Sequence, residues 1–233
     1  MLIALLTVLG NQAAATELIR IGTWDNQSDL AIVASNAVLK RAYSKLNQPF
    51  EFVELPIRRA FFLLTHDQLD ANVHRTAHIF ANYPQLVQVP TPINTVSIRG
   101  YVRQGYHSNV ARWSDTKGLV VTYPRGTLMF ENKLPATAKH VAAASINEMF
   151  RMVERGTADI AIVAEPAGSP AHPWAAVNGL VRLAPALDQT PLYHALSGQH
   201  CDLAVRLNAV LEQMRDSGEM QDIQKRALAT HTN

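Results

Sequence analysis

The feature that most constrains this 233-residue chain is the alternation of short apolar runs with amphipathic segments. Short runs rich in Val, Ile and Ala indicate strands, and apolar residues spaced by three and four indicate helices. Such an alternation is typical of α/β layers built on largely parallel sheets. The expected strands are residues 18–22, 50–55, 69–73, 86–89, 96–102, 118–123, 159–164 and 192–196.

Capping residues indicate where the helices begin and end. Asp29 suits an N-cap, Pro56 opens a helix where its missing N–H costs nothing, and Gly156 closes another helix. Residues 165–173 are rich in Pro and Gly and predict a loop. The expected helices are residues 29–45, 127–133, 145–155, 202–214 and 220–228, with one more starting at Pro56.

Composition and charge exclude several classes of function. The chain is 48% apolar and 17% charged, as in ordinary globular proteins. Its formal net charge is +2 and its basic residues are scattered, so we expect no nucleic-acid partner. The single cysteine, Cys201, has no internal disulfide partner, and we expect it to be a packed thiol at a helix start.

The N-terminus has the pattern of an export signal. An apolar run over residues 2–9 leads to Ala13-Ala14-Ala15, and we expect cleavage after Ala15. No Lys or Arg precedes the run, which indicates a longer signal starting upstream; the alternative is a buried first strand or helix. No cysteine stands at the cleavage point, so we expect a freely soluble exported protein rather than a lipid-anchored one.

Residues 55–93 contain the strongest indication of a binding site. A helix there is followed by a strand ending in Asn72-Val73-His74-Arg75. Open α/β folds bind ligands at the carboxyl ends of their strands, and a guanidinium can grip a carboxylate with two hydrogen bonds. We therefore expect Arg75 to anchor a carboxylate, with Asn72 beside it. The alternative is a structural ion pair of Arg75 with Asp70 or with another residue of the same lobe.

Five motifs follow one another along the mature chain. They are Leu55-Pro56-x-x-Arg59-Ala60 with Leu63-Leu64, Leu69-Asp70-Ala71 and Arg75; Tyr83-Pro84-x-Leu86-Val87-x-Val89-Pro90; Arg125-Gly126-Thr127; residues 149–162; and residues 207–218. In order and spacing they resemble the bacterial periplasmic solute-binding proteins of family 3, which serve polar amino acid ABC transporters. The resemblance covers nearly the whole mature length.

The resemblance implies a fold and a mode of action. The fold is α/β, periplasmic-binding-protein-like type II, with two α/β lobes joined by two crossover strands. Residues 1–15 would be the signal peptide, residues 16–98 and 191–233 the first lobe, and residues 99–190 the second. A small polar solute, an amino acid or a related carboxylate, would bind in the cleft and close it, for delivery to an inner-membrane permease. We expect a monomer that needs no cofactor and performs no catalysis.

The resemblance also implies contacts on both sides of the cleft. Trp24 and Asp25 follow the first strand, where the family contacts its ligand, although Trp24 could equally pack on the lobe. From the other lobe, free N–H groups at the start of a helix and the Thr127 hydroxyl would receive the carboxylate beside Gly126. The alternative for Thr127 is an ordinary helix cap.

Two further residues complete the expected site. Glu165 follows a strand and would hold a ligand ammonium group, although the family's acidic residue is displaced by one position here. Arg59 matches a recurrent family arginine, with a solvated surface charge as the alternative. The aromatic residue that often follows Leu-Pro in the family is replaced by Ile57, so the resemblance leaves the identity of the ligand open.

Other chemistries have weaker support in the sequence. His74 and His78 have the spacing of a helical metal pair, but His74 lies at a strand end and no third ligand is apparent, so we expect no metal. Neither Ser197-Gly198 nor Cys201 has the surroundings of a nucleophile. The remaining alternatives are a dehydratase or lyase on the same fold, with Glu165 as acid or base, and a sensory accessory protein.

Overall fold

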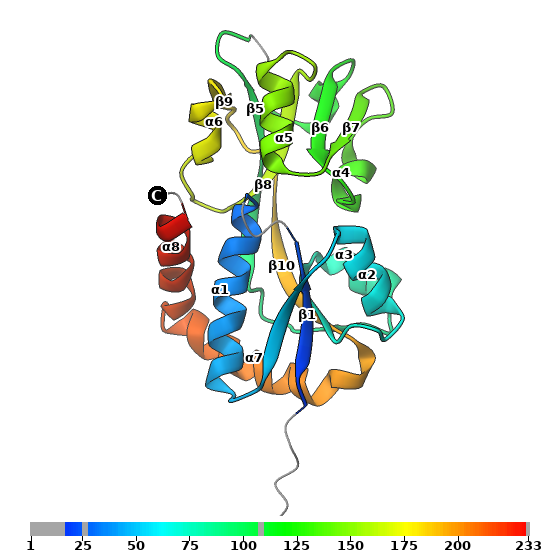
Figure 1. Cartoon of the computed structure of the whole chain (residues 1–233), viewed down its shortest axis with the longest axis vertical. Coiled ribbons are helices and arrows are strands. Elements are labelled where there is room, and N and C mark those ends of the chain that lie inside the picture. Colours follow the sequence, from blue (N-terminus) through cyan, green and yellow to red (C-terminus); the bar gives the residue numbers. More distant parts are fainter. Residues whose placement is uncertain (1–16, 25–27, 107–109, 232–233) are drawn as a thin grey trace, which may run out of the picture.

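The chain folds into two α/β lobes arranged along the long axis of the molecule (Figure 1). The structure, a computed structural model, describes residues 17–24, 28–106 and 110–231. The expected fold class, two lobes joined by two crossover strands, is confirmed. The expected signal peptide, residues 1–15, and Asp25 lie outside the described residues.

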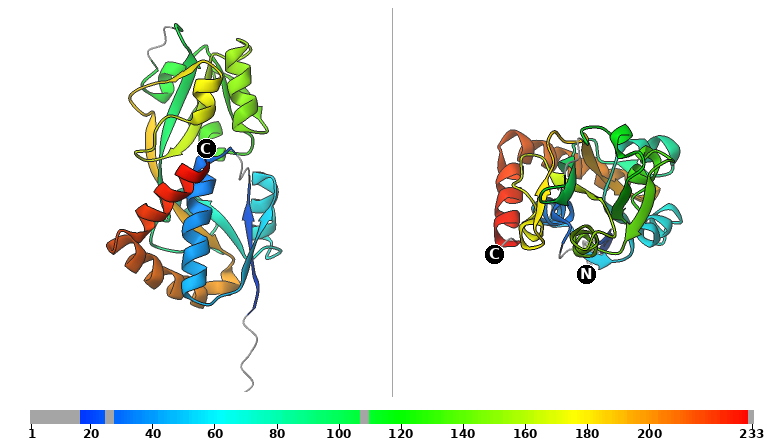
Figure 2. Two further views of the ribbon diagram at one scale, coloured as in Figure 1. Left: turned by 60° about the vertical axis from the view of Figure 1, so that its left-hand side comes forward. Right: turned by 90° about the horizontal axis from the view of Figure 1, so that it is seen from above.

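Segments from both ends of the described chain build the lower lobe in Figure 1. Strand β1 pairs in parallel with β2 and with β3. Helices α1, α7 and α8 share one core cluster with this sheet, and α8 packs along α1 (Figures 1 and 2). The elements are β1 (Ile19–Thr23), α1 (Leu30–Lys45), β2 (Phe50–Glu54), α2 (Ile57–Thr65), β3 (Ala71–Arg75), α3 (Ala77–Asn82), β4 (Val87–Gln88), α7 (Cys201–Asp216) and α8 (Glu219–His231).

The upper lobe repeats the α/β pattern on a smaller scale. Strand β6 pairs in parallel with β7 and β8, and α5 packs its apolar face, including the fully buried Phe150, against this sheet. The elements are β6 (Val120–Pro124), α4 (Leu128–Lys133), β7 (Lys139–Ala143), α5 (Ile146–Glu154), β8 (Ile160–Pro166), α6 (Pro173–Val177) and β9 (Leu180–Arg182). Short 3₁₀ turns cover Trp113–Thr116 in this lobe and Gly198–His200 in the other.

Two crossover strands, β5 (Asn94–Arg103) and β10 (Asp188–Leu196), join the lobes. They pair antiparallel, with Asn94 opposite Leu192 and Ile98 opposite Asp188. At its far end β10 pairs with β3, and from Val96 to Tyr101 β5 pairs with β8 on its other edge, so the strand order runs β2-β1-β3-β10-β5-β8-β6-β7. The sequence predicted largely parallel sheets. The crossover strands instead add antiparallel pairs. Strand β10 runs antiparallel to β3 and to β5, and β5 runs antiparallel to β8.

Local sequence signals located the longer elements well and the short ones poorly. Asp29 caps α1, its carboxylate accepting the N–H groups of Ala31 at 2.9 Å and Ile32 at 3.2 Å. Strand β3 continues two residues beyond the predicted end and includes Arg75. The elements α3, β7, α6 and β9 were not predicted, because each is too short to show a period. Cys201 begins α7 as expected but is exposed rather than packed.

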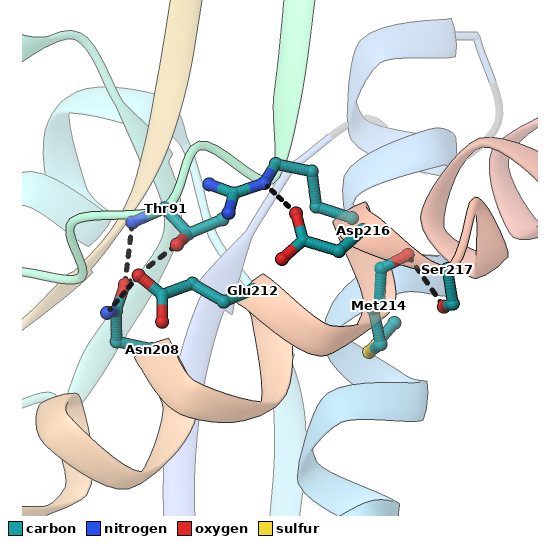
Figure 3. Close-up of polar contacts among 7 residues, drawn as sticks. Thr91, Asn208, Glu212, Met214, Asp216 and Ser217 are labelled. Atoms are coloured by element: carbon teal, nitrogen blue, oxygen red, sulfur yellow. Dashed lines mark hydrogen bonds and ion pairs between the residues drawn. The ribbon is translucent and has the colours of Figure 1, made fainter.

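The segment that leads into β5 is fastened to α7 through Asn208 (Figure 3). The backbone N–H and the hydroxyl of Thr91 both donate to the Asn208 side-chain oxygen, each at 2.8 Å. The Asn208 amide nitrogen in turn donates to Glu212 at 3.1 Å. Since Thr91 is 2% exposed, it has little access to water as an alternative partner. These contacts fix where the first crossover strand leaves the lower lobe.

Replacing Asn208 by Ala is expected to lower the free energy of unfolding by about 1–3 kcal/mol, because two buried donors of Thr91 lose their acceptor. Urea denaturation followed by circular dichroism measures the change. Val205→Ala is the matched control on the same helix, since Val205 is 72% exposed and its truncation should change stability by less than about 0.5 kcal/mol. Equal stability losses in the two variants would contradict the prediction.

Candidate functional site

A cleft of about 130 Å³ lies between the lobes, beside the carboxyl end of β3. This is small compared with the roughly 300–1,000 Å³ of pockets for drug-sized ligands. A second hollow of about 500 Å³ shares Trp24, Ile57 and Arg58 with the cleft, so the space between the lobes is larger than the cleft alone. Four of the eight residues predicted to bind ligand line the cleft: Trp24, Arg75, Gly126 and Thr127. The other lining residues are Asp29, Ala31, Ile57, Arg58, Phe61, His74, Thr76, Ile79, Val96, Pro124, Leu128, Met129, Phe130, Ile146, Ala164 and Leu192.

Arg75 is one of the two arginines among the described residues that line the cleft, and Arg58 is the other. The Arg75 guanidinium carbon lies 5.0 Å from the ring centroid of Trp24 and 5.1 Å from that of Phe61. Its Nε is buried and has no hydrogen-bond partner among the described residues. Burial lowers the pKa of Arg75 to about 9, which still leaves the side chain charged at pH 7. A half-buried cation with an unpaired donor is arranged to receive an anion.

The structural alternative for Arg75, an ion pair with Asp70, is not found. The Asp70 carboxylate accepts the backbone N–H of Arg20 at 2.8 Å and lies 3.1 Å from Nε2 of His200. No ion pair involving Arg75 occurs among the described residues. The charge of Arg75 therefore has no acidic partner in the described part of the chain.

Asn72 positions Arg75 instead of lining the cleft as predicted. It is fully buried, and its amide nitrogen donates to the carbonyl oxygens of Ala60 and Ala71, each at 3.2 Å. Its side-chain oxygen accepts from Nη2 of Arg75. Asn72 and Arg75 are three positions apart on β3, so their side chains leave the strand on opposite sides. The arginine side chain is long enough to reach both the Asn72 side chain and the cleft.

His74 adds a neutral polar group behind the cleft. Its Nδ1 lies 3.0 Å from the hydroxyl of Ser35, and its ring makes an edge contact with Trp24 at a centroid distance of 5.3 Å. Burial, followed by the neighbouring charge of Arg75, lowers the pKa of His74 to about 3. The imidazole is therefore uncharged at neutral pH and does not compete with Arg75 for an anion.

The turn before α4 forms the facing wall. Gly126 has φ +90°, a conformation that favours glycine, and an added Cβ would lie 3.0 Å from Cγ of Arg58. The N–H groups of Thr127 and Leu128 donate to carbonyl oxygens of the same turn, at 3.2 Å and 3.1 Å. Those two amides are thus engaged, contrary to the expected free N–H groups. The Thr127 hydroxyl makes no hydrogen bond within the described residues.

Sequence reasoning chose Arg59 on α2, but its neighbour Arg58 lines the cleft. Ile57, Arg58 and Phe61 face the upper lobe along one side of the helix, whereas Arg59 is exposed and lies over the ring of Phe62 at 5.6 Å. Arg58 Nη2 donates to both carboxylate oxygens of Glu131 in α4, each at 2.9 Å. This contact joins the two lobes across the mouth of the cleft.

Glu165 does not line the cleft. It is 1% exposed, and its carboxylate accepts from the hydroxyl of Tyr101 and from Arg182 Nη1 at 3.1 Å. Burial raises the pKa of Glu165, and the bonds from Tyr101 and Arg182 oppose that rise. Adjacent strand residues face opposite sides, so Ala164 faces the cleft and Glu165 the interior of the upper lobe.

The network around Glu165 also reaches the lower lobe. The Tyr101 hydroxyl accepts the backbone N–H of His172 at 2.8 Å. Nδ1 of His172 accepts the N–H of Trp174 at 3.3 Å, so its Nε2 carries the proton and donates to the Ser28 carbonyl at 2.8 Å. Ser28 directly precedes the cap of α1. Glu165 therefore serves a structural contact between the lobes.

Two further observations concern metal binding and membrane insertion. Among residues 17–24, 28–106 and 110–231, no three His, Cys, Asp or Glu side chains gather as metal ligands would. In the same ranges no helix has the length and apolar character needed to span a bilayer.

Comparisons based on sequence alone find no relatives. No protein-family model matches the chain. No curated protein matches it either.

Comparisons of structure find many similar folds. AbpA from Streptococcus pneumoniae, an amino acid ABC transporter substrate-binding protein bound to L-arginine, matches with a TM-score of 0.76 at 11% identity, over 93% of this chain and 96% of that one. A mutant of ArgBP from T. maritima matches at 0.75 and 16% identity, over 91% and 95%. A histidine kinase sensor domain with similarity to periplasmic binding proteins matches at 0.73 and 17% identity, over 91% and 96%. The chain thus has the fold of these binding proteins.

The buried histidines predict how stability depends on pH. Burial lowers the pKa of His74 to about 3 and of His194 to about 4, against about 6.5 in an unfolded chain. As pH falls below 6.5 the unfolded chain takes up these protons and the folded chain does not, so stability is complete above pH 6.5 and declines toward pH 4. Each of the two histidines should lower the free energy of unfolding by about 2 kcal/mol when the pH falls from 7.5 to 5.

Urea denaturation at pH 7.5 and pH 5 measures this loss. In His194→Gln the loss should be smaller by about 2 kcal/mol, because the titrating ring is gone. His78→Gln is the control, because His78 is exposed on α3. This variant should lose as much unfolding free energy between pH 7.5 and pH 5 as the unmodified protein does. An unchanged loss in His194→Gln would show that His194 is not held neutral by the fold.

Proposed function

We propose that this chain is a solute-binding protein of the family 3 type, which captures a small carboxylate in the cleft between its lobes. One observation carries the proposal. Arg75 presents a charged guanidinium with an unpaired, buried Nε beside the cleft, and no acidic side chain among the described residues neutralises it. Trp24, Gly126 and Thr127 line the same cleft and complete the proposed contacts, together with Asp25.

We further propose that ligand binding closes the lobes about the crossover strands. Contacts across the cleft mouth support this, because Arg58 bonds Glu131 and His172 bonds the Ser28 carbonyl. In this proposal one lobe comprises residues 16–98 and 191–233, and the other comprises residues 99–190. A hinge with two strands allows the rigid-body closure by which binding proteins enclose ligands.

The partner is proposed by analogy of fold. Amino acid ABC transporter substrate-binding proteins share this fold, which favours an inner-membrane permease as partner. We propose a monomeric, periplasmic protein released from its signal peptide, as the sequence resemblance implied. A sensory role would use the same cleft with a different partner, and a histidine kinase sensor domain has the same fold. A lyase with Glu165 as acid or base is disfavoured, since that carboxylate is buried away from the cleft.

Isothermal titration with amino acids, small peptides and organic acids tests the proposal. For any carboxylate that binds, Arg75→Ala should weaken affinity by about 100-fold, because a buried charge-assisted bond to the ligand is lost. Arg75→Lys keeps the charge but loses the planar fork, so about tenfold is expected. Arg59→Ala, on the exposed side of α2, should leave affinity within about threefold. Equal affinities in Arg75→Ala and Arg59→Ala would remove Arg75 from the site.

Gly126→Ala tests closure separately from ligand contact. The added Cβ would lie 3.0 Å from Cγ of Arg58 and 3.3 Å from Cβ of Ile57, in the opposite lobe. We expect the variant to bind about tenfold more weakly, because the lobes cannot fully approach.

Gly118→Ala is the matched control for backbone strain. Gly118 has φ +78°, close to the +90° of Gly126, but its Cβ would meet nothing within 4 Å. Both variants should lose about 1–2 kcal/mol of stability in thermal unfolding, and only Gly126→Ala should lose affinity. If the two variants bound ligand equally, closure at this turn would not contribute to binding.

A further inference from the structure

The hydroxyl of Ser35, on α1, lies between two polar side chains. Asn94, the first residue of the crossover strand β5, places its amide nitrogen 3.2 Å from the Ala31 carbonyl oxygen and 3.3 Å from Ser35 Oγ. A carbonyl oxygen can only accept a hydrogen bond, so the end of the Asn94 amide that faces Ala31 is its nitrogen. Ser35 Oγ therefore accepts a hydrogen bond from Asn94.

The proton of the Ser35 hydroxyl needs an acceptor of its own, because Ser35 is fully buried. Nδ1 of His74 lies 3.0 Å from Ser35 Oγ and is the acceptor for this proton among the described residues. Burial lowers the pKa of His74 to about 3, so the ring is neutral at pH 7 and holds a single proton. Since Nδ1 accepts, that proton is on Nε2, which makes Nε2 a hydrogen-bond donor.

The donor nitrogen of His74 belongs to the cleft. His74 lines the cleft together with Arg75 and Trp24. Adjacent residues of a strand point to opposite sides, but at this strand end the Trp24 ring contacts both, with its centroid 5.3 Å from that of the His74 ring and 5.0 Å from the guanidinium carbon of Arg75. Nε2 makes no hydrogen bond within the described residues and, unlike Nε of Arg75, is not enclosed by them.

We infer that His74 is a second ligand-binding residue, whose Nε2–H donates to the carboxylate that the guanidinium of Arg75 receives. Ser35 and Asn94 are positioning residues, because their hydrogen bonds fix which ring nitrogen carries the proton. The opposite tautomer would present the lone pair of Nε2 to the ligand and would repel a carboxylate. The inference rests on the proposed function, because it adds a contact to the same site.

Long-range ¹H–¹⁵N NMR spectra of the full chain at pH 7.5 test the tautomer without any ligand. In the unmodified protein we expect an unprotonated Nδ1 and a protonated Nε2 on the ring of His74. In Ser35→Ala the share of rings with a protonated Nδ1 should rise, because Nδ1 has lost its hydrogen-bond donor. A proton on Nδ1 in the unmodified protein would overturn the inference, whatever the cleft binds.

Two substitutions at His74 test the contact by isothermal titration against acetate, succinate, leucine, glutamate and arginine. The amide of Gln reaches about as far as Nε2 of histidine, whereas the shorter Asn reaches only as far as Nδ1. For each probe that loses affinity in Arg75→Ala, His74→Asn should weaken binding about tenfold, and His74→Gln should recover most of that loss. His140→Asn, on the exposed His140 of β7, is the control and should leave the affinity unchanged.

The same probes should move the His74 Nε2–H resonance of the unmodified protein, because the donor gains a charged acceptor. This shift needs no substitution at His74, so it decides the contact even if a variant fails to fold.

Three further outcomes would count against the inference. If a probe bound in a way that depends on Arg75 while the Nε2–H resonance stayed in place, His74 would not contact the ligand, and the proposed function would stand. If Asp25→Asn moved that resonance without any probe, the donor would serve Asp25 rather than a ligand. If neither these probes nor the wider panel of peptides and organic acids bound in a way that depends on Arg75, the proposed function would fail and the inference with it.

Discussion

The antiparallel pairing of β5 with β10 is the constraint on which the rest of the molecule depends. Backbone hydrogen bonds along Asn94–Ile98 and Asp188–Leu192 tie the two lobes into one continuous order of strands. Both crossover strands also reach the cleft, through Val96 and Leu192. Val96 and Leu192 therefore belong both to the strands that connect the lobes and to the lining of the proposed site. A rotation of one lobe consequently changes the shape of the site.

The charge of Arg75 could not lie at this depth without its surroundings. Taking a guanidinium from water is costly, and here the aromatic rings of Trp24 and Phe61 and the side-chain oxygen of Asn72 offset part of that cost. His74 contributes by remaining neutral, since a second positive charge next to Arg75 would raise the cost further. An anionic ligand would offset the rest of the cost of removing the Arg75 guanidinium from water.

Periodicity in the sequence predicted the α/β layers and a strand that leads to Arg75, whereas the two lobes were implied by the family resemblance. It could not distinguish Arg58 from Arg59, because on a nine-residue helix a rotation of one position moves either arginine between the cleft and solvent. Nor could it show which side of β8 faces the cleft, since every residue from Ile160 to Ala164 is apolar and no alternation is visible. The sequence assigned Glu165 to the ligand because it follows this strand and lies one position from the acidic residue of the resembling family.

The contacts that join the lobes are weak compared with what a ligand supplies. The pair of Arg58 and Glu131 has an arginine side chain that is 67% exposed, and exposed ion pairs contribute about 0–1 kcal/mol. The hydrogen bond from His172 to the Ser28 carbonyl adds about 0.5–1.5 kcal/mol. Such contacts steer the approach of the lobes without holding them shut by themselves. Closure would then depend on a ligand that satisfies Arg75 on one side and buries the apolar wall of α4 on the other, and this links selectivity to the conformational change itself.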